Sequence, residues 1–282
     1  MQICGRQFSE SELAWIRNQI LSRPDLNRVQ LSRLFCRYTG WRKPDGGLKE
    51  MSCRVALLRL DRSGLIRLPP PKTKPNAVRK VQRTPKGEPK PSISFELSDV
   101  ALSFDPVERK SAPLWNELID RYHYLGFSRH GGAQMRFFVR IAEEPVALLG
   151  FSAAAWRVAP RDEFIGWTDR QRKQNLHLVI DNSRFLILPW VHCKNLASWI
   201  LSYAARNLPS YWQQRYHYRP LLLETFVDKQ RFSGTCYKAA NWICVGQTLG
   251  RGKWDRKNAY EKPVKTIWLY PLDRRFRERL CR

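Results

Sequence analysis

Several features that carry chemistry in other proteins are missing from this sequence. The seven cysteines include no Cys-X-X-Cys pair and the five histidines follow no zinc-ligand spacing, so the pattern predicts reduced thiols and no zinc site. There is no glycine-rich phosphate loop of the ATPase type, so any ATP-driven step would belong to a partner. No apolar run approaches the roughly 18 residues of a membrane span, and no secretion signal is recognisable. We therefore expect a cytoplasmic protein.

Acidic residues are also scarce relative to basic ones. The chain has 50 lysines and arginines against 25 aspartates and glutamates, a formal net charge of +25. A surplus of this size attracts polyanions and accelerates their encounter with the protein. DNA is therefore the predicted partner and no membrane partner is expected, although an anionic membrane surface or a merely soluble cationic protein would also fit. Hydrophobic residues make up 43% of the chain, which indicates a folded protein.

Three helices and a strand are predicted in the first 68 residues. Ser9 with Glu12 and Asn27 with Gln30 are the patterns that start helices at 9–23 and 27–40. A third helix is expected over 50–63 and a strand over 65–68. This order is typical of a winged helix-turn-helix DNA-binding domain, with a helical protein-interaction module as the alternative. The basic side chains that would contact DNA there are Arg42, Lys43, Arg59 and Arg62.

A proline-rich basic segment separates this domain from a larger one. Residues 69–92 contain seven prolines and seven basic residues against one glutamate, which predicts a semi-extended linker. Residues 93–282 then predict a mixed-sheet α/β domain, with a helix after Ser111, a hairpin over 134–151, a helix flanked by loops within 164–179 and a strand at 184–188. A helix at 195–207, a strand at 221–227, a short helix at 234–241 and strands at 243–248 and 264–270 follow. This order is similar to the GNAT acyltransferase fold, which implies a cleft between strands 184–188 and 221–227.

Carboxylates and a tyrosine near strand 221–227 suggest DNA strand chemistry. Glu224 and Asp228 share one face of the strand, since side chains alternate, and Asp181 precedes the neighbouring strand. The three could hold Mg²⁺ or Mn²⁺ for phosphodiester cleavage. Tyr237 could instead attack a phosphate, with Lys238 or Arg251 as the assisting cation. The plainer alternative is that the carboxylates pair with Arg184 or Arg231 and that Tyr237 is a packing residue.

Binding without catalysis and acyl transfer are two further possibilities. Aromatic and basic residues are interleaved, as suits stacking of unpaired bases: Trp167, Tyr237, Lys238, Trp242, Arg251, Lys253 and Trp254. Asn241 and Trp242 would shape the binding pocket. For acyl transfer, Tyr237 occupies the place of the tyrosine that protonates the thiolate leaving group in GNAT enzymes. The turn at 192–198 lacks the glycine that lets a cofactor pyrophosphate approach the backbone, which counts against acetyl-CoA.

Four motifs carry a more specific resemblance. They are Asn182-Ser-Arg-Phe-Leu-Ile-Leu-Pro189 with Asn195-Leu-Ala-Ser198, Glu224-Thr-Phe-Val-Asp228, Gly234-Thr-Cys-Tyr-Lys-Ala-Ala-Asn-Trp242 and Val245-Gly-Gln-Thr-Leu-Gly-Arg-Gly252. Over residues 100–272 the chain resembles the DruA-like proteins of the Druantia antiphage system. The resemblance implies a protein of bacterial defence or a related mobile element, working with other defence proteins, and supplies no reaction. The predicted function is DNA binding with nuclease-like or transposase-like cutting or rejoining of strands, and binding alone is the alternative.

Overall fold

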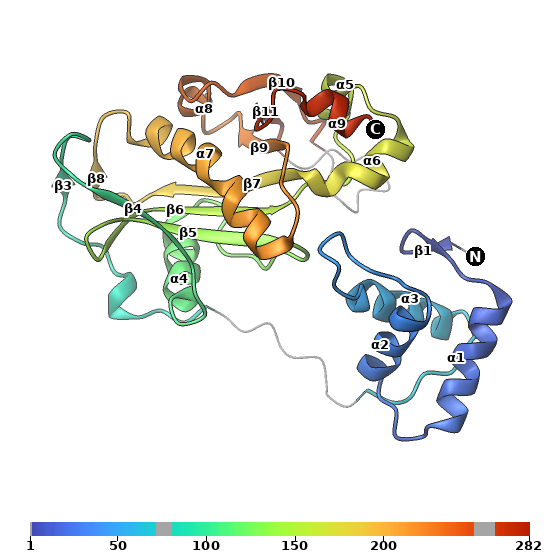
Figure 1. Ribbon diagram of the computed structural model, residues 1–282. Coiled ribbons are helices and arrows are strands. Elements are labelled where there is room, and N and C mark those ends of the chain that lie inside the picture. Colours follow the sequence, from blue (N-terminus) through green and yellow to red (C-terminus); the bar gives the residue numbers. More distant parts are fainter. Residues whose placement is uncertain (1, 72–80, 251–262) are drawn as a thin grey trace. The chain divides into compact units, whose positions relative to one another are not determined.

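The chain divides into two compact units, residues 1–79 and 80–282. The structure is a computed structural model that describes residues 2–71, 81–250 and 263–282 (Figure 1). Each unit has hydrophobic cores of its own, and each is described by itself below.

Unit 1 is helical. A small antiparallel pair, β1 (Gln2–Ile3) and β2 (Arg6–Gln7), precedes α1 (Glu10–Ser22), α2 (Arg28–Tyr38) and α3 (Glu50–Arg62). The expected capping boxes of Ser9 with Glu12 and of Asn27 with Gln30 are both present, so local sequence fixes the starts of the first two helices. The apolar faces of the helices meet in one core, which includes Leu13, Ile16, Leu31, Phe35, Leu57 and Leu60.

The strand expected at 65–68 does not form, and no wing follows α3 up to residue 71, where the described part of unit 1 ends. Ile66 and Leu68 are buried in the core, so the alternation that predicted a strand is real. The backbone groups of this segment, however, bind side chains instead of a neighbouring strand. Asp61 accepts from the Leu68 N–H at 2.8 Å, and Arg17 donates to the Leu65 carbonyl at 2.9 Å. The winged form of the helix-turn-helix is therefore not confirmed.

Unit 2 is a mixed α/β domain built on a seven-stranded sheet. Its strand order is β10-β11-β9-β7-β6-β5-β4. All neighbours are antiparallel except β7 and β9, which are parallel. The strands span β4 (Leu102–Pro106), β5 (Gln134–Ile141), β6 (Glu144–Ala153), β7 (Val179–Ile187), β9 (Leu222–Asp228), β10 (Ile243–Gln247) and β11 (Lys265–Pro271). A separate parallel pair joins β3 (Ile93–Ser94) to β8 (Val191–His192).

Helices cover both faces of this sheet. Figure 1 shows α4 (Ala112–Tyr122) on one side of β5 and β6 and α7 (Leu196–Tyr216) on the other. The short α8 (Thr235–Ala239) contacts α7. The segment between β6 and β7 forms α5 (Ala159–Ile165) and α6 (Asp169–Asn175), and α6 contacts the C-terminal α9 (Phe276–Leu280). The predicted order of helix, hairpin, strand, helix, strand, short helix and strand is confirmed.

Two helices differ from their predicted bounds. The helix expected to end near residue 207 continues to Tyr216 through Pro209, because Leu208 and Trp212 beyond that point are fully buried in the core. The segment 164–179, expected as one helix with loops, contains the end of α5 and then α6. Gly166 separates them in a left-handed conformation, with φ of 83°.

The end of the predicted linker packs on unit 2. Glu117 of α4 is 1% exposed and accepts from the backbone N–H of Thr84 at 2.6 Å and from its hydroxyl at 2.7 Å. The hydroxyl of Tyr122 donates to the Gly87 carbonyl at 2.9 Å. Residues 84–87 are therefore held by specific bonds and are not a solvated tether. Residues 72–80 lie outside the described part of the chain.

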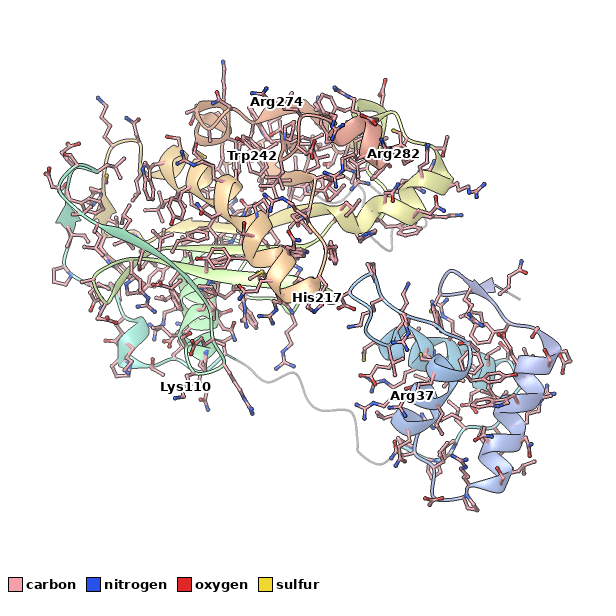
Figure 2. All side chains as sticks on the ribbon, viewed as in Figure 1. Arg37, Lys110, His217, Trp242, Arg274 and Arg282 are labelled. Carbon is pink, nitrogen blue, oxygen red and sulfur yellow. The ribbon has the colours of Figure 1, made fainter. Side chains whose placement is uncertain are left out.

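Cationic side chains project from both units. Figure 2 labels Arg37 in unit 1 and Lys110, Arg274 and Arg282 in unit 2, all exposed. The seven cysteines are all described and form no disulfide, and Cys36 and Cys53 are buried in the unit 1 core. Within the described residues, no helix is both long enough and apolar enough to cross a membrane.

Candidate functional site

The parallel strands β7 and β9 pair only at their beginning. Three residue pairs are in register, from Val179 opposite Leu222 to Asp181 opposite Glu224, and pairing ends there. A cleft of about 390 Å³ occupies the gap beyond. We call it the β7/β9 cleft; it is lined by residues 123–125, 182–185, 187, 225–228 and 231–237. The expected cleft between these two strands is thus present.

A buried polar chain forms one wall of the β7/β9 cleft. The hydroxyl of Tyr237 donates to Oδ1 of Asn182 at 2.9 Å, and the hydroxyl of Thr225 donates to the Asn182 carbonyl at 3.0 Å. The Asn182 amide in turn donates to the carbonyls of Gly150 and Arg184. Burial raises the pKa of Tyr237, so its phenol stays protonated at neutral pH. In this state it is a hydrogen-bond donor and a poor nucleophile.

Arg184 is a nearly buried cation on the same wall. It is 8% exposed and donates to three neutral oxygens: the carbonyls of Gly126 at 3.3 Å and Ser183 at 2.6 Å, and the Ser128 hydroxyl at 2.9 Å. A guanidinium has five N–H donors, so two have no partner among the described residues. Among the described residues no carboxylate lies within 4.0 Å of it.

Arg184 is unusual for a buried cation because it has no counter-ion within the described part of the chain. Asp181 is the acid whose charge acts on Arg184. Burial and the neighbouring Glu224 raise the pKa of Asp181, which favours its neutral form. Burial likewise lowers the pKa of Arg184. A cation in this setting is costly unless an anion joins it.

Aromatic rings and a second arginine line the cleft further along. The rings of Tyr124 and Phe232 are 5.6 Å apart, and the guanidinium of Arg231 lies 5.3 Å from the Tyr124 ring. Phe232 is 53% exposed and the Arg231 side chain 60% exposed. Asp228 is the single acid among the described lining residues; it is 3% exposed and lies 3.9 Å from Arg231. As far as the structure describes it, the lining has two arginines and one carboxylate.

His123 is neutral in this environment. Its Nδ1 accepts a hydrogen bond from the Leu125 N–H at 3.2 Å. Burial, with the nearby charges of Arg184 and Lys265, lowers the pKa of His123 to about 4. The ring consequently adds no positive charge at neutral pH and keeps its Nε2–H as a donor.

The structure places the predicted catalytic residues on different faces of the sheet. Glu224 and Thr225 are consecutive in β9, so their side chains point to opposite faces. Tyr237 lies on the Thr225 face, whereas Glu224 binds α5 on the other. Asp228 shares the Glu224 face but lies four residues along the strand, about 13 Å away. Glu224 and Asp181 are absent from the cleft lining.

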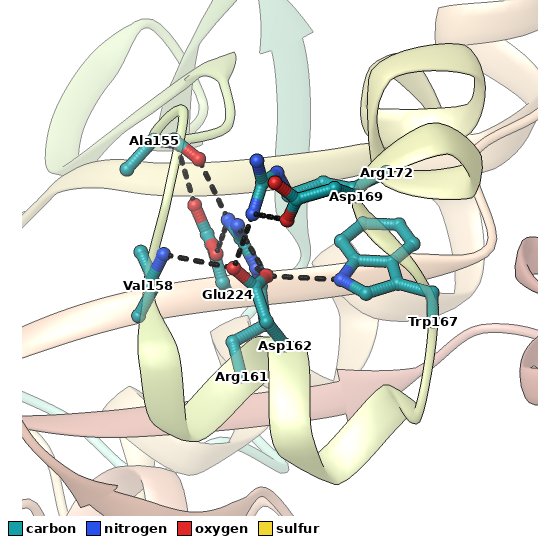
Figure 3. A network of polar contacts seen from close by, with 8 residues as sticks. All are labelled: Ala155, Val158, Arg161, Asp162, Trp167, Asp169, Arg172 and Glu224. Atoms are coloured by element: carbon teal, nitrogen blue, oxygen red, sulfur yellow. Dashed lines mark hydrogen bonds and ion pairs between the residues drawn. The ribbon is translucent and has the colours of Figure 1, made fainter.

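Glu224 is committed to a buried ion-pair network (Figure 3). It is 0% exposed, and its two oxygens accept from the Ala155 N–H and from Arg161, both at 2.8 Å. Arg161 is itself 0% exposed and also pairs with Asp162 at 2.7 Å. Trp167 donates to the same Asp162 at 3.1 Å. Trp167, expected to stack with bases, is thus an 8% exposed part of this network.

The three carboxylates do not form the expected metal site. Among the described residues, which include Asp181, Glu224 and Asp228, no group of three acidic, cysteine or histidine side chains is placed to hold a metal ion. Glu224 has both oxygens occupied by N–H donors, and the strand spacing separates it from Asp228. Within the described part of the chain, these three carboxylates are therefore not placed to hold Mg²⁺ or Mn²⁺ together.

The predicted nucleic-acid contacts are spread over the chain. Lys238 and Asn241 are exposed at and after α8, whereas Trp242 is 4% exposed and packs on the Tyr237 ring, 5.1 Å away. Trp242 is therefore a core residue. The basic side chains predicted in unit 1 are all exposed: Arg42, Lys43, Arg59 and Arg62. Arg251 and Lys253, with Trp254, lie outside the described residues.

Several cleft residues were not predicted as binding residues. Arg184 and Arg231 were considered only as partners of carboxylates, and Tyr124 and Phe232 were not singled out. The available signal was the arginine within Asn182-Ser-Arg184 and the aromatic run at 122–127. These two segments are distant in the sequence, so the pattern alone could not show that the end of α4 lies beside β7 and β9 in the fold.

Fold and cleft together define a two-unit protein whose larger unit is a mixed α/β domain with an arginine-lined opening in its sheet. The sequence matches the family described as "Druantia protein DruA" over residues 59–266, so the chain belongs to the DruA family of antiphage defence. No curated protein matches the sequence.

Some solved structures are similar to part of the chain. The ribosomal-protein-S18-alanine N-acetyltransferase of Escherichia coli is 9% identical, with a TM-score of 0.38, over 61% of this chain and 95% of its own. A GNAT-family acetyltransferase of Streptococcus pneumoniae is 12% identical, with a TM-score of 0.40, over 61% and 100%. Aminoglycoside acetyltransferase AAC(6')-Ib in complex with coenzyme A is 10% identical, with a TM-score of 0.39, over 64% and 98%.

Proposed function

We propose that the protein binds nucleic acid in antiphage defence and that the β7/β9 cleft holds an unpaired DNA segment. The observation that carries this proposal is Arg184, a cation 8% exposed on the cleft wall with no carboxylate within ion-pair distance among the described residues. A phosphate would supply the missing negative charge and accept the unused N–H donors, which guanidinium groups offer to phosphates in a fixed fork.

The rest of the lining supports the same class of ligand. The rings of Tyr124 and Phe232, 5.6 Å apart, give apolar faces on which bases can stack. Arg231 lies beside them and is exposed enough to reach a backbone phosphate. Unpaired DNA is favoured over duplex because a cleft of about 390 Å³ accommodates single nucleotides and not a double helix. The net charge of +25 draws the polyanion to the protein.

The unit 1 cations have an auxiliary part in this proposal. Arg42, Lys43, Arg59 and Arg62 are exposed, and we propose that they contact phosphates without reading bases. Such contacts add affinity and carry little sequence information.

Binding is better supported than strand cutting. Metal-assisted cutting would need the oxygens of Glu224, which already accept hydrogen bonds from Ala155 and Arg161. Attack by Tyr237 would need an ionised phenol, which burial disfavours by raising the pKa of Tyr237. We expect no cleavage of labelled single-stranded or duplex DNA in Mg²⁺ or Mn²⁺. Cleavage that disappears in Tyr237→Phe or Glu224→Gln would restore the catalytic proposal.

The test compares the cleft with an equally charged exposed site. Fluorescence anisotropy with a labelled single strand should show Tyr124→Ala binding weakened by about 1–3 kcal/mol, the value of one stacked base. Arg231→Ala should also weaken binding, while Arg274→Ala, exposed and outside the cleft, should bind nearly as the unchanged protein does. Equal effects of the two arginine substitutions would reject the cleft as the binding site.

Acyl transfer is the second candidate, and one observation favours it. Pairing between β7 and β9 ends where a GNAT-like enzyme would hold the acyl carrier, and Tyr237 lines that opening. The absence of glycine from the turn at 192–198 counts against this candidate, because side chains there would crowd a cofactor pyrophosphate. Thermal stabilisation by micromolar acetyl-CoA would support this candidate over DNA binding.

A further inference from the structure

Unit 1 has an apolar groove that the proposed DNA contacts do not use. It has a volume of about 650 Å³ and lies between the start of α2 and α3. Its floor includes Val29, Met51, Val55 and Leu58. Met51 is 62% exposed and Val55 41% exposed. Large apolar side chains gathered in one exposed groove mark an interaction surface more often than chance exposure.

This groove occupies the part of α3 that a DNA-reading helix would use. In a helix-turn-helix the first turns of the recognition helix contact base edges, and most of those contacts are hydrogen bonds from polar side chains. Here the exposed side chains of the first two turns include Met51 and Val55. The groove therefore suits an apolar partner and not the edges of bases.

The rim of the groove is positive. Arg28, Arg33 and Arg54 line it, and Arg33 pairs with Glu50 at 2.7 Å. Neither Arg28 nor Arg54 has a carboxylate partner among the residues described in unit 1. Arg28 donates to the Pro69 carbonyl at 2.7 Å, and the buried Nε of Arg54 has no hydrogen-bond partner that the structure describes. A partner with acidic groups beside its apolar surface would complement this rim.

We propose that the groove binds an amphipathic helix of another protein, with acidic residues flanking an apolar stripe. A helix about 10 Å across can lay such a stripe into a groove through residues spaced i, i+3, i+4 and i+7. Met51 and Val55 contact the stripe, and Arg28 and Arg54 pair with the flanking acids. The proposal concerns unit 1 and is independent of the β7/β9 cleft in unit 2.

The experiment uses the full chain and a pair of synthetic peptides. One fluorescent peptide of roughly four helical turns has leucines on one face and glutamates beside them; in the second, lysines replace the glutamates. Anisotropy titrations should show the acidic peptide binding at least roughly tenfold more tightly than the basic one, because the rim repels like charge. Val55→Glu should lower the affinity for the acidic peptide by roughly tenfold or more, because the new carboxylate repels the glutamates of the peptide and an apolar contact is lost.

Leu21→Glu is the matched control. Leu21 is 79% exposed on α1 and does not line the groove, so the same chemical change is made on another exposed helix of unit 1. Its peptide affinity should equal that of the unchanged chain. Equal affinity for the two peptides would overturn the proposal, as would equal loss in both variants. A dimer of the unchanged chain that Val55→Glu converts to monomer would identify a second copy as the occupant and also overturn it.

Discussion

At the scale of single residues, the buried pair of Glu224 and Arg161 explains why the conspicuous carboxylate of β9 does not face the cleft. Both side chains are 0% exposed. Burial raises the pKa of Glu224, and Arg161 opposes that rise. Removing one member would leave an uncompensated charge in the interior, which costs far more than the intact pair contributes. The pair therefore fixes α5 against β9, and its chemistry is structural.

This view predicts the effect of Arg161→Met on stability. The substitution should lower the free energy of unfolding by about 3–5 kcal/mol, because Glu224 stays buried without its cation. Adding Glu224→Gln should recover part of the loss, since the amide removes the uncompensated charge. Urea denaturation measures both, and Arg274→Met, at an exposed site, should stay within about 0.5 kcal/mol of the unchanged protein. A small effect of Arg161→Met alone would contradict the role of the pair.

His123 predicts a pH dependence of stability. The pKa of His123 in the folded protein is about 4, against an ordinary value of 6.5. Between these two pH values the ring is therefore protonated in the unfolded chain and neutral in the folded protein. The contribution of His123 to stability is therefore complete above pH 6.5 and is lost as the pH falls toward 4. His123→Asn keeps an acceptor for the Leu125 N–H and removes the titration. As the pH is lowered from 6.5 to 4, the melting temperature of the variant should fall less steeply than that of the unchanged protein. Equal slopes for the two proteins would refute a role of His123 in this pH dependence.

At the scale of elements, local patterns predicted most of the fold. The capping boxes at Ser9 and Asn27 and the apolar spacing of the helices are properties of short segments, and both are confirmed. Strand β4 was not predicted: residues 102–106 do alternate between apolar and polar side chains, but the segment is only five residues long and Phe104 is its single buried residue. The second half of α7 was not predicted because Pro209 normally disfavours a helix interior. The helix continues through it because Leu208 and Trp212 are buried in the core.

The candidate site was less predictable than the fold, for a related reason. Sequence placed Glu224, Asp228 and Tyr237 within one short stretch, and closeness along the chain suggested a shared site. In the structure, side chains alternate between the two faces of the sheet along β9, and α8 lies on one of these faces. Glu224 and Tyr237 are therefore on opposite faces of the sheet. Arg184 joins Tyr124 and Arg231 only through the tertiary fold. Such long-range placement has no local sequence signal.

Gly234 shows how one element positions the cleft wall. It precedes α8 with φ of 77°, and an added Cβ would lie 2.7 Å from the Trp268 ring. Gly234→Ala should therefore destabilise the protein by about 1–3 kcal/mol through overpacking, in addition to the cost of the left-handed backbone. Gly166→Ala is the matched control, because Gly166 has φ of 83° with nothing within 4 Å. Thermal melts should show a larger loss of stability for Gly234→Ala than for Gly166→Ala. Equal losses would show that the Trp268 ring moves aside to make room for the added methyl group.

At the scale of the whole molecule, the surplus of cations raises the question of where a polyanion is held. A net charge of +25 alone gives diffuse attraction without a defined site. The cleft differs from this background because Arg184 is held by three hydrogen bonds and Arg231 lies close to the Tyr124 ring and to Asp228. Cations positioned in advance lose less entropy on binding a phosphate than mobile surface side chains do.

Salt dependence separates these two sources of affinity. Each phosphate neutralised in a single strand contributes about −0.7 to the slope of log Kobs against log salt concentration. We expect a steep negative slope for the unchanged protein, because many cations participate. Arg231→Ala should make the slope shallower by about 0.7, since one ordered contact is lost, while Arg274→Ala should change it little. Anisotropy titrations of a labelled single strand at several salt concentrations give all three slopes. If Arg231→Ala and Arg274→Ala shift the slope equally, the attraction is diffuse and the cleft does not hold the strand.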